Sequence, residues 1–205
     1  IAGISHVAAP VLDLSGEGAD AVIGDRAFGT TPAEVIPLAT AFIDGVTRSG
    51  VTPIVKHIPG MGRADIDSHQ SLPVVKTPVS ILEQSDWIPF QVVSGTRWAM
   101  TAHIVIPEWD QQPITTSERA MSHIRSLFGD RIIVSDCVTM GAFTGAIEER
   151  IQRTLDAGVD LALFSNGSDE ERRSAVEASG DPRVIREEPN ELKALPSSTL
   201  KILLQ

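Results

Sequence analysis

Cysteine, basic residues and long apolar runs are scarce in this chain, and each scarcity excludes a class of protein. Cys137 is the single cysteine in 205 residues, which excludes an internal disulfide framework and a cysteine-rich metal site. Seventeen Lys and Arg residues stand against 27 Asp and Glu residues, giving a net charge of −10. A nucleic-acid partner is therefore not expected, because phosphate binding needs a basic face. No apolar run reaches the roughly 18 residues of a membrane span.

The rest of the composition is that of an ordinary globular protein. Hydrophobic residues make up 42% of the chain, and 205 residues are enough to bury a full core. We therefore expect one domain over residues 1–205, acting as a monomer. The lone cysteine fits a reducing compartment, which predicts a cytoplasmic protein with no membrane partner.

Continuous apolar runs recur along the chain and are separated by amphipathic segments. The runs cover residues 4–12, 51–58, 98–105, 131–138 and 160–165, with a weaker sixth at 183–186. Runs that do not alternate with polar residues are typical of strands buried on both faces. Strands alternating with helices predict parallel βαβ units and an α/β fold.

One helix start is well marked between the first two runs. Thr31 is the expected N-cap, Pro32 occupies the first turn, and Glu34 completes a capping box. The expected buried face of this helix comprises Val35, Leu38, Phe42 and Val46.

Two α/β architectures are compatible with this order, an open doubly wound sheet and a TIM (β/α)₈ barrel. No Gly-x-Gly-x-x-Gly follows a first strand, which weighs against a dinucleotide-binding sheet. Polar residues follow the strands where they end, as in a barrel active site. They are Asp13, Lys56, His57, His103, Asp136 and Asn166. A barrel typically needs about 250 residues, so we expect an incomplete barrel whose first two or so βα units are absent.

Residues 56–69 hold the densest titratable chemistry, with two histidines, a lysine, an arginine and two aspartates around a glycine-rich loop. His69 with Asp67 is a candidate acid/base pair, because an adjacent carboxylate orients an imidazole that gives and takes a proton near neutral pH. The alternative is a surface turn. Lys56 and His57 are either ligands for a polyhydroxylated substrate or rim residues whose polar ends reach solvent.

Three residues outside that loop are also candidates. Asp136 ends an apolar run, where a carboxylate could attack an anomeric carbon, bind a metal or simply cap the next helix. Arg26 is either a substrate clamp or a loop residue paired with Asp25. His103 could face the same cleft or be a structural histidine.

Together these stretches resemble glycoside hydrolase family 3, in its bacterial β-N-acetylglucosaminidase (beta-hexosaminidase) branch. The matching motifs are KHIPG at 56–60, DSH at 67–69, PVLD at 10–13, IGDRAFG at 23–29, MTAH at 100–103 and VSD at 134–136. They occur in the family's order between about residues 1 and 166. The Asp-Ser-His loop distinguishes this branch from family members that use a glutamate as acid/base.

The resemblance implies a retaining glycoside hydrolase without metal or other cofactor. Asp136 would form the glycosyl-enzyme, and His69, oriented by Asp67, would be the acid/base. The residues implied to hold the sugar hydroxyls are Arg26, Lys56 and His57. The implied small-molecule substrate is a muropeptide fragment, GlcNAc-1,6-anhydro-MurNAc, from which terminal non-reducing β-linked N-acetylglucosamine is removed during peptidoglycan recycling.

Two departures and three alternatives accompany this resemblance. Met61 replaces the histidine of the usual Pro-Gly-His-Gly, and Cys137 stands where a second acidic residue is usual. One alternative is a phosphorylase of the same family, because a histidine acid/base repels incoming phosphate less than a carboxylate would. The others are a non-catalytic sugar-binding relic and a metal-dependent barrel hydrolase. The ligands of that metal would be His57, His69, His103 and Asp136.

Overall fold

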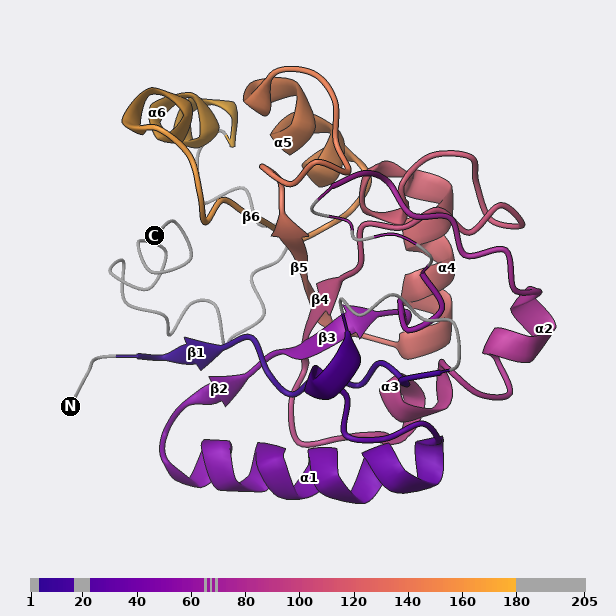
Figure 1. Ribbon diagram of the computed structural model, residues 1–205. Helices are drawn as coiled ribbons and strands as arrows, with labels where there is room; N and C mark the ends of the chain where they lie inside the picture. Colours follow the sequence, from indigo (N-terminus) through magenta and orange to yellow (C-terminus); the bar gives the residue numbers. More distant parts are fainter. Residues whose placement is uncertain (1–3, 17–22, 65, 67, 69, 180–205) are drawn as a thin grey trace.

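The computed structural model describes residues 4–16, 23–64, 66, 68 and 70–179. All of its strand pairings are parallel, and strands follow one another in space as they do in sequence (Figure 1). A two-stranded sheet pairs β1 with β2, and a four-stranded sheet has the order β3-β4-β5-β6. The strands are β1 His6–Val7, β2 Thr52–Pro53, β3 Val55–Ile58, β4 Trp98–Thr101, β5 Ile132–Cys137 and β6 Leu161–Leu163.

The five main apolar runs all contain strand, so the α/β prediction is confirmed, although most strands are shorter than their runs. A parallel bridge between Val11 and Lys56 joins the end of the first run to β3. The order of the runs is therefore sequential, whereas a doubly wound sheet reverses its strand order at a switch point. The weak sixth run, residues 183–186, lies outside the described residues.

A closed barrel is not present in the part of the chain that the structure describes. There, β1 pairs only with β2, and β6 pairs only with β5. A TIM barrel was expected. The described residues show a parallel α/β arrangement that is consistent with an incomplete barrel. Closure needs strands that hydrogen-bond on both sides all the way round, and the described strands leave two edges.

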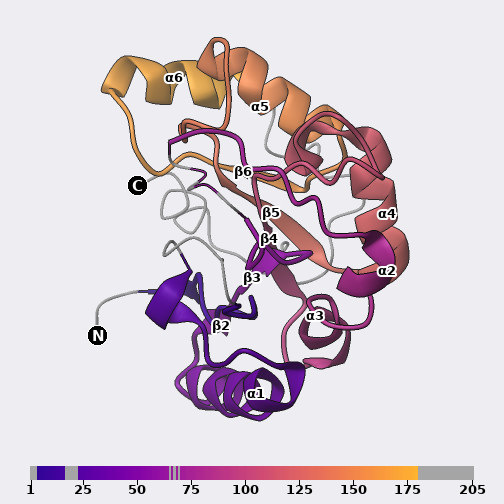
Figure 2. The ribbon, with the colours of Figure 1, turned by 45° about the vertical axis from the view of Figure 1, so that its right-hand side comes forward.

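The helices follow one another along an arc around one face of the strands (Figures 1 and 2). Short 3₁₀ turns lie at η1 Gly24–Arg26 and η2 Ile114–Thr116. The α-helices are α1 Pro32–Arg48, α2 Val79–Leu82, α3 Ile88–Val92, α4 Glu118–Phe128, α5 Ile147–Asp156 and α6 Asp169–Ala178. Among the described residues, none of these helices has the length and apolar character needed to cross a bilayer.

Successive strand residues supply two apolar clusters, one on each face of the sheet, because side chains alternate along a strand. On the helix-covered face, Val55, Ala99 and Ile133 belong to the main core. A second cluster holds Ile54, Trp98, Met100, Ile132 and Val134. Burying each large apolar side chain contributes about 1.5–3 kcal/mol, so both faces stabilise the sheet.

The start of α1 is as predicted, but its buried face is partly wrong. The Glu34 carboxylate accepts hydrogen bonds from the backbone N–H groups of Thr30, at 2.8 Å, and Thr31, at 3.0 Å. Leu38 and Phe42 are 51% and 37% exposed. The fully buried residues are Val35, Ala39 and Ile43.

The buried side of α1 lies close to the chain before β4. A Cβ atom at Gly95 would lie 2.9 Å from the Cγ2 atom of Ile43. Phe42, the neighbour of Ile43, is partly exposed and packs against Phe28.

Candidate active site

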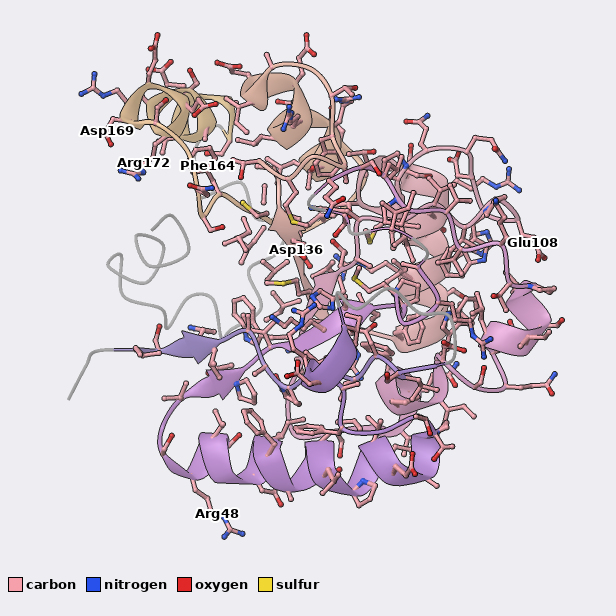
Figure 3. All side chains as sticks on the ribbon, in the orientation of Figure 1. Arg48, Glu108, Asp136, Phe164, Asp169 and Arg172 are labelled. Atoms are coloured by element: carbon pink, nitrogen blue, oxygen red, sulfur yellow. The ribbon has the colours of Figure 1, made fainter. Side chains whose placement is uncertain are left out.

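The candidate residues lie at the carboxyl ends of neighbouring parallel strands. In the sheet register, Lys56 is opposite Met100, and Met100 is opposite Val134. Asp136 is two residues beyond Val134, so it projects from the same face of β5. Figure 3 shows Asp136 in the middle of the molecule, at the end of β5.

Asp13 is the most heavily hydrogen-bonded side chain of the site and is fully buried. Its Oδ2 atom accepts from the backbone N–H of His57 at 3.0 Å and from His57 Nδ1 at 2.7 Å. Its Oδ1 atom accepts from the backbone N–H of Met61 at 2.7 Å. Burying a carboxylate is costly unless it is paired and hydrogen-bonded, and these three donors compensate that cost.

His57 connects Asp13 to the candidate nucleophile. Its Nε2 atom lies 3.8 Å from Oδ2 of Asp136, whose side chain is 19% exposed. That distance is too long for a direct hydrogen bond. The other Asp136 oxygen, Oδ1, accepts from the backbone N–H of Cys137 at 2.7 Å. Asp136 is thus fixed on one side, with Oδ2 nearer His57.

Lys56 and Arg26 add positive charge to the same region. Lys56 is half-buried and Arg26, at the end of η1, is exposed. Burial lowers the pKa of Lys56, the Asp136 and Asp13 carboxylates oppose that effect, and the Arg26 charge adds to it. The four predicted residues outside the Asp-Ser-His loop, Arg26, Lys56, His57 and Asp136, are therefore electrostatic neighbours.

His103 belongs to the interior, and both of its ring nitrogens have protein partners. It is fully buried, with Nδ1 2.9 Å from Thr115 Oγ1 and Nε2 3.1 Å from the Cys137 carbonyl oxygen. Its ring packs edge-on against Phe143. Burial lowers the pKa of His103. Of its two sequence interpretations, the structural one is confirmed, and His103 supports the backbone next to Asp136.

Cys137 is likewise engaged inside the fold. Its Sγ atom accepts from the backbone N–H of Ser165 at 3.3 Å and lies 3.0 Å from Thr139 Oγ1. Burial raises the pKa of the thiol, but the hydrogen bonds to Ser165 and Thr139 outweigh it and lower the pKa overall.

The predicted acid/base pair, Asp67 and His69, lies outside the described residues. Ser68, between them, is described and buried. Its carbonyl oxygen accepts from the backbone N–H of Ala142 at 3.0 Å. Ala142 lies in the connection that follows Asp136, so the backbone of the Asp-Ser-His segment at residue 68 is attached to the chain leaving β5.

The glycines of the Pro-Gly-Met-Gly loop allow close packing. A Cβ atom at Gly62 would lie 1.9 Å from the Leu14 carbonyl oxygen. The loop therefore crosses directly over the backbone that follows Asp13. Met61, within this loop, is buried.

The metal alternative gains no support from the described residues, in which no three His, Cys, Asp or Glu side chains are grouped to hold an ion. His103, one of the four ligands imagined for it, directs both ring nitrogens to protein partners. His69, another of the four, lies outside the described residues.

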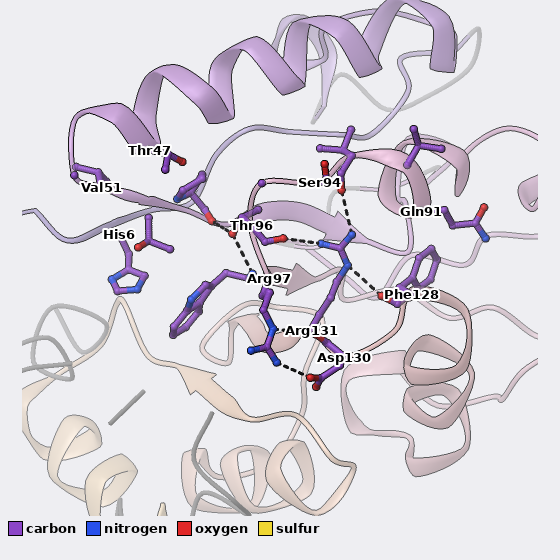
Figure 4. A pocket seen from close by; sticks show the side chains of 17 residues that line it. His6, Thr47, Val51, Gln91, Ser94, Thr96, Arg97, Phe128, Asp130 and Arg131 are labelled. Atoms are coloured by element: carbon purple, nitrogen blue, oxygen red, sulfur yellow. Dashed lines mark hydrogen bonds and ion pairs between the residues drawn. The ribbon is translucent and has the colours of Figure 1, made fainter. Parts of the chain in front are cut away.

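A separate cavity of about 810 Å³ lies at the end of the strands opposite to the candidate site, between His6, Val51, Thr96 and Arg131 (Figure 4). The Arg131 guanidinium donates to the Phe90 carbonyl oxygen at 2.7 Å, so its charge serves to hold the chain together there. Barrel active sites lie at the carboxyl ends of the strands, and this cavity is at their amino ends.

Sequence reasoning gave no role to Asp13, which the structure places in the candidate site. Asp13 was noted as polar at a strand end, yet no role followed, because its partners are 44 and 48 positions away. The available signal was a carboxylate placed directly after a fully apolar run, where burial is costly unless the group has partners.

Comparison with known proteins supports a single family. The Glycosyl hydrolase family 3 N terminal domain matches residues 2–182. A beta-hexosaminidase of Thiobacillus denitrificans is 38% identical over 170 residues, which cover 80% of this chain and 47% of the relative. One of Tolumonas auensis is 40% identical over 165 residues, covering 77% and 49% respectively. The chain thus spans about half the length of the curated relatives it matches.

Solved structures agree with these relatives. A family 3 beta-N-acetylglucosaminidase from Paenibacillus sp. str. FPU-7 aligns with a TM-score of 0.80 at 30% identity, covering 98% of this chain and 38% of that one. NagZ from Neisseria gonorrhoeae, solved with a zinc ion, aligns with a TM-score of 0.75 at 31% identity, covering 99% and 60%.

Proposed function

This chain belongs to glycosyl hydrolase family 3, and we propose that it is a retaining β-N-acetylhexosaminidase. It removes terminal, non-reducing, β-linked N-acetylglucosamine. The names of the curated relatives support the enzyme class. The observation that carries the proposal is the cluster of Lys56, His57 and Asp136 at the carboxyl ends of adjacent strands.

In the first step, Asp136 attacks the anomeric carbon and the glycosidic C–O bond breaks, leaving a glycosyl ester. Support comes from its partial exposure and from the Cys137 N–H, which fixes one carboxylate oxygen. A carboxylate held in this way approaches the sugar in one orientation, so less conformational freedom is lost on reaction.

His69 gives its proton to the departing oxygen, with Asp67 holding the imidazole. It then removes a proton from the water that attacks the anomeric carbon, the ester C–O bond to Asp136 breaks, and the sugar and the Asp136 carboxylate are released. This assignment rests on the Asp-Ser-His motif. It is supported by the hydrogen bond from Ala142 to Ser68, which attaches this segment to the connection after Asp136.

Arg26, Lys56 and His57 bind the hydroxyl groups of the sugar. The N–H groups of Arg26 and Lys56 suit hydroxyl oxygens, and a histidine ring nitrogen can donate or accept. The lowered pKa of Lys56 reflects a partly desolvated position near Asp136. The natural substrate we propose is GlcNAc-1,6-anhydro-MurNAc, degraded in the cytoplasm during peptidoglycan recycling by a monomeric protein.

The test is turnover of 4-nitrophenyl N-acetyl-β-D-glucosaminide compared with the β-glucoside and the α-linked N-acetylglucosaminide. We expect cleavage of the first alone, and release of N-acetylglucosamine from the disaccharide GlcNAc-1,6-anhydro-MurNAc. Equal cleavage of the β-glucoside would contradict the hexosaminidase assignment.

Two additions to the same assay separate the alternatives. Inorganic phosphate should change neither the rate nor the product, whereas formation of a sugar 1-phosphate would identify a phosphorylase. EDTA should leave the rate unchanged, and loss of activity that zinc restores would favour a metal-dependent hydrolase.

A further inference from the structure

Asp13 joins two parts of the site that are distant in sequence. It is 0% exposed. Its carboxylate accepts from the backbone N–H and the ring Nδ1 of His57 and from the backbone N–H of Met61. The end of the first strand run is thereby tied to β3 and to the start of the Pro-Gly-Met-Gly loop.

The contact at 2.7 Å also determines which ring nitrogen of His57 carries a proton. Each oxygen of the Asp13 carboxylate already accepts a backbone N–H, and a carboxylate is an acceptor only, so His57 Nδ1 must be the donor. The other nitrogen, Nε2, then faces Oδ2 of Asp136 at 3.8 Å. A neutral His57 in this orientation presents an acceptor at Nε2, and a charged His57 presents a donor.

The space between His57 Nε2 and Asp136 Oδ2 is too wide for their own hydrogen bond. A third polar group that lies to one side of the line joining these two atoms could hydrogen-bond to both of them. A sugar hydroxyl is such a group, because it both donates and accepts.

We propose that Asp13 is the positioning residue of this site, fixing the tautomer and orientation of His57 so that Nε2 meets a substrate hydroxyl beside Asp136. The sugar part of this proposal rests on the hexosaminidase function proposed above. The tautomer part does not, and it is tested on the protein without substrate.

The first test is ¹⁵N NMR of the histidine rings, with His57 assigned by its absence in His57→Gln. In the unaltered protein we expect His57 to carry a proton on Nδ1. A neutral His57 that carries its proton on Nε2 would overturn the proposal with no variant needed.

Asp13→Asn should redistribute the His57 tautomers. Asparagine keeps the size of the side chain but has one acceptor oxygen, so its amide N–H₂ must face a donor at His57 or Met61. The Nε2–H form of His57 should then appear. Asp13→Ala removes both acceptor oxygens, so an unchanged His57 spectrum in folded Asp13→Asn and folded Asp13→Ala proteins would contradict the proposal.

Asp160→Asn is the matched control. The Asp160 carboxylate also accepts a backbone N–H, from Ile133 at 2.6 Å, and a side-chain N–H, from Arg125 at 2.7 Å. It lies at the opposite edge of the sheet, before β6. Its loss should lower stability and leave the His57 tautomer as it was.

Kinetics supply the second test. Asp13→Asn should lower kcat/KM by about 10- to 100-fold, by analogy with the loss of a hydrogen-bond partner that orients a metal-ligating histidine. In a His57→Ala background the same change should cost less than about threefold, because the effect acts through His57. Full additivity of the two losses would show that Asp13 does not work through His57. A protein that cleaves no N-acetylglucosaminide would defeat the proposed function, and the NMR result would still decide the role of Asp13.

Discussion

At the scale of single residues, His103 should make folding depend on pH. Burial lowers its pKa in the folded protein below the ordinary value of 6.5. The unfolded chain therefore binds the proton more tightly, and stability is greatest above pH 6.5 and falls as the pH drops through that value towards the folded pKa. One such group changes the unfolding free energy by at most about 1.4 kcal/mol per pH unit.

Urea denaturation between about pH 7 and pH 5 measures this slope. His103→Asn should flatten it, since the variant has no imidazole there to protonate on unfolding. His123, which is exposed and stacked on Trp109, gives the control His123→Gln, with the slope retained. Identical slopes in the unaltered protein and His103→Asn would rule out this account of His103.

His69 should matter most where the leaving group is poor. A general acid contributes about 10²–10⁴-fold, and a nitrophenolate departs with little help. We expect His69→Ala to lose far more activity on GlcNAc-1,6-anhydro-MurNAc than on 4-nitrophenyl N-acetyl-β-D-glucosaminide, with Asp67→Ala a milder version. Equal losses on both substrates would mean that His69 binds the sugar and does not donate the proton.

The sequence predicted which polar groups would lie near one another better than it predicted their interactions. Lys56, His57 and Asp136 were each recognisable as polar groups ending apolar runs, and parallel strands bring such ends together. The hydrogen bonds of Asp13 and the choice between the two roles of His103 were not predictable, because both depend on partners 12 to 48 positions away.

At the scale of elements, the loop after β3 depends on Gly62 for contact with the chain after Asp13. In Gly62→Ala the new Cβ would lie 1.9 Å from a backbone oxygen that cannot rotate away, so the loop or Leu14 must move. We expect a loss of about 1–3 kcal/mol of stability, as for other overpacked positions, together with lower activity.

Gly45→Ala is the matched control for this prediction. Gly45 lies inside α1, and an added Cβ there meets nothing within 4 Å. Alanine should raise stability by about 0.4–1 kcal/mol, because it restricts the unfolded chain and favours a helix. Urea unfolding of both variants decides the matter, and a Gly62→Ala protein as stable as the original would refute the close contact.

The elements themselves were located by pattern, but their extents and faces were not. Each main apolar run contains strand, because continuous burial on two faces demands apolar residues. The predicted buried face of α1 was partly wrong, because Leu38 and Phe42 fit the helical period as well as Ala39 and Ile43 do. Which of the two faces is buried depends on tertiary contacts, such as that of Ile43 with the chain at Gly95.

At the scale of the whole molecule, the described strands differ in how many neighbours they have. β4 and β5 pair on both sides, whereas β1 and β6 pair on one. Hydrogen exchange should therefore be slowest in β4 and β5 and clearly faster in β1 and β6, whose outer groups have no strand partner in the described part of the chain. Equal protection of all four strands would show that β1 and β6 have partners beyond those described.

The same pairing explains what could be predicted of the architecture. Strand and helix alternation indicated a parallel α/β fold, and the sequential strand order agrees with an incomplete barrel. Closure could not be settled from local patterns, because it depends on which strands meet across the whole molecule.

The central claim is that Asp136 forms the glycosyl-enzyme, and trapping that species tests it most directly. An N-acetylglucosaminide with a dinitrophenyl leaving group is mixed with the protein, the reaction is quenched in acid, and the peptides are mapped by mass spectrometry. We predict one N-acetylhexosaminyl group, on the peptide that contains Asp136. It should be absent from Asp136→Asn and present in Asp44→Asn, a control at an exposed position of α1. An adduct on another residue, or turnover by Asp136→Asn at the original rate, would contradict the mechanism.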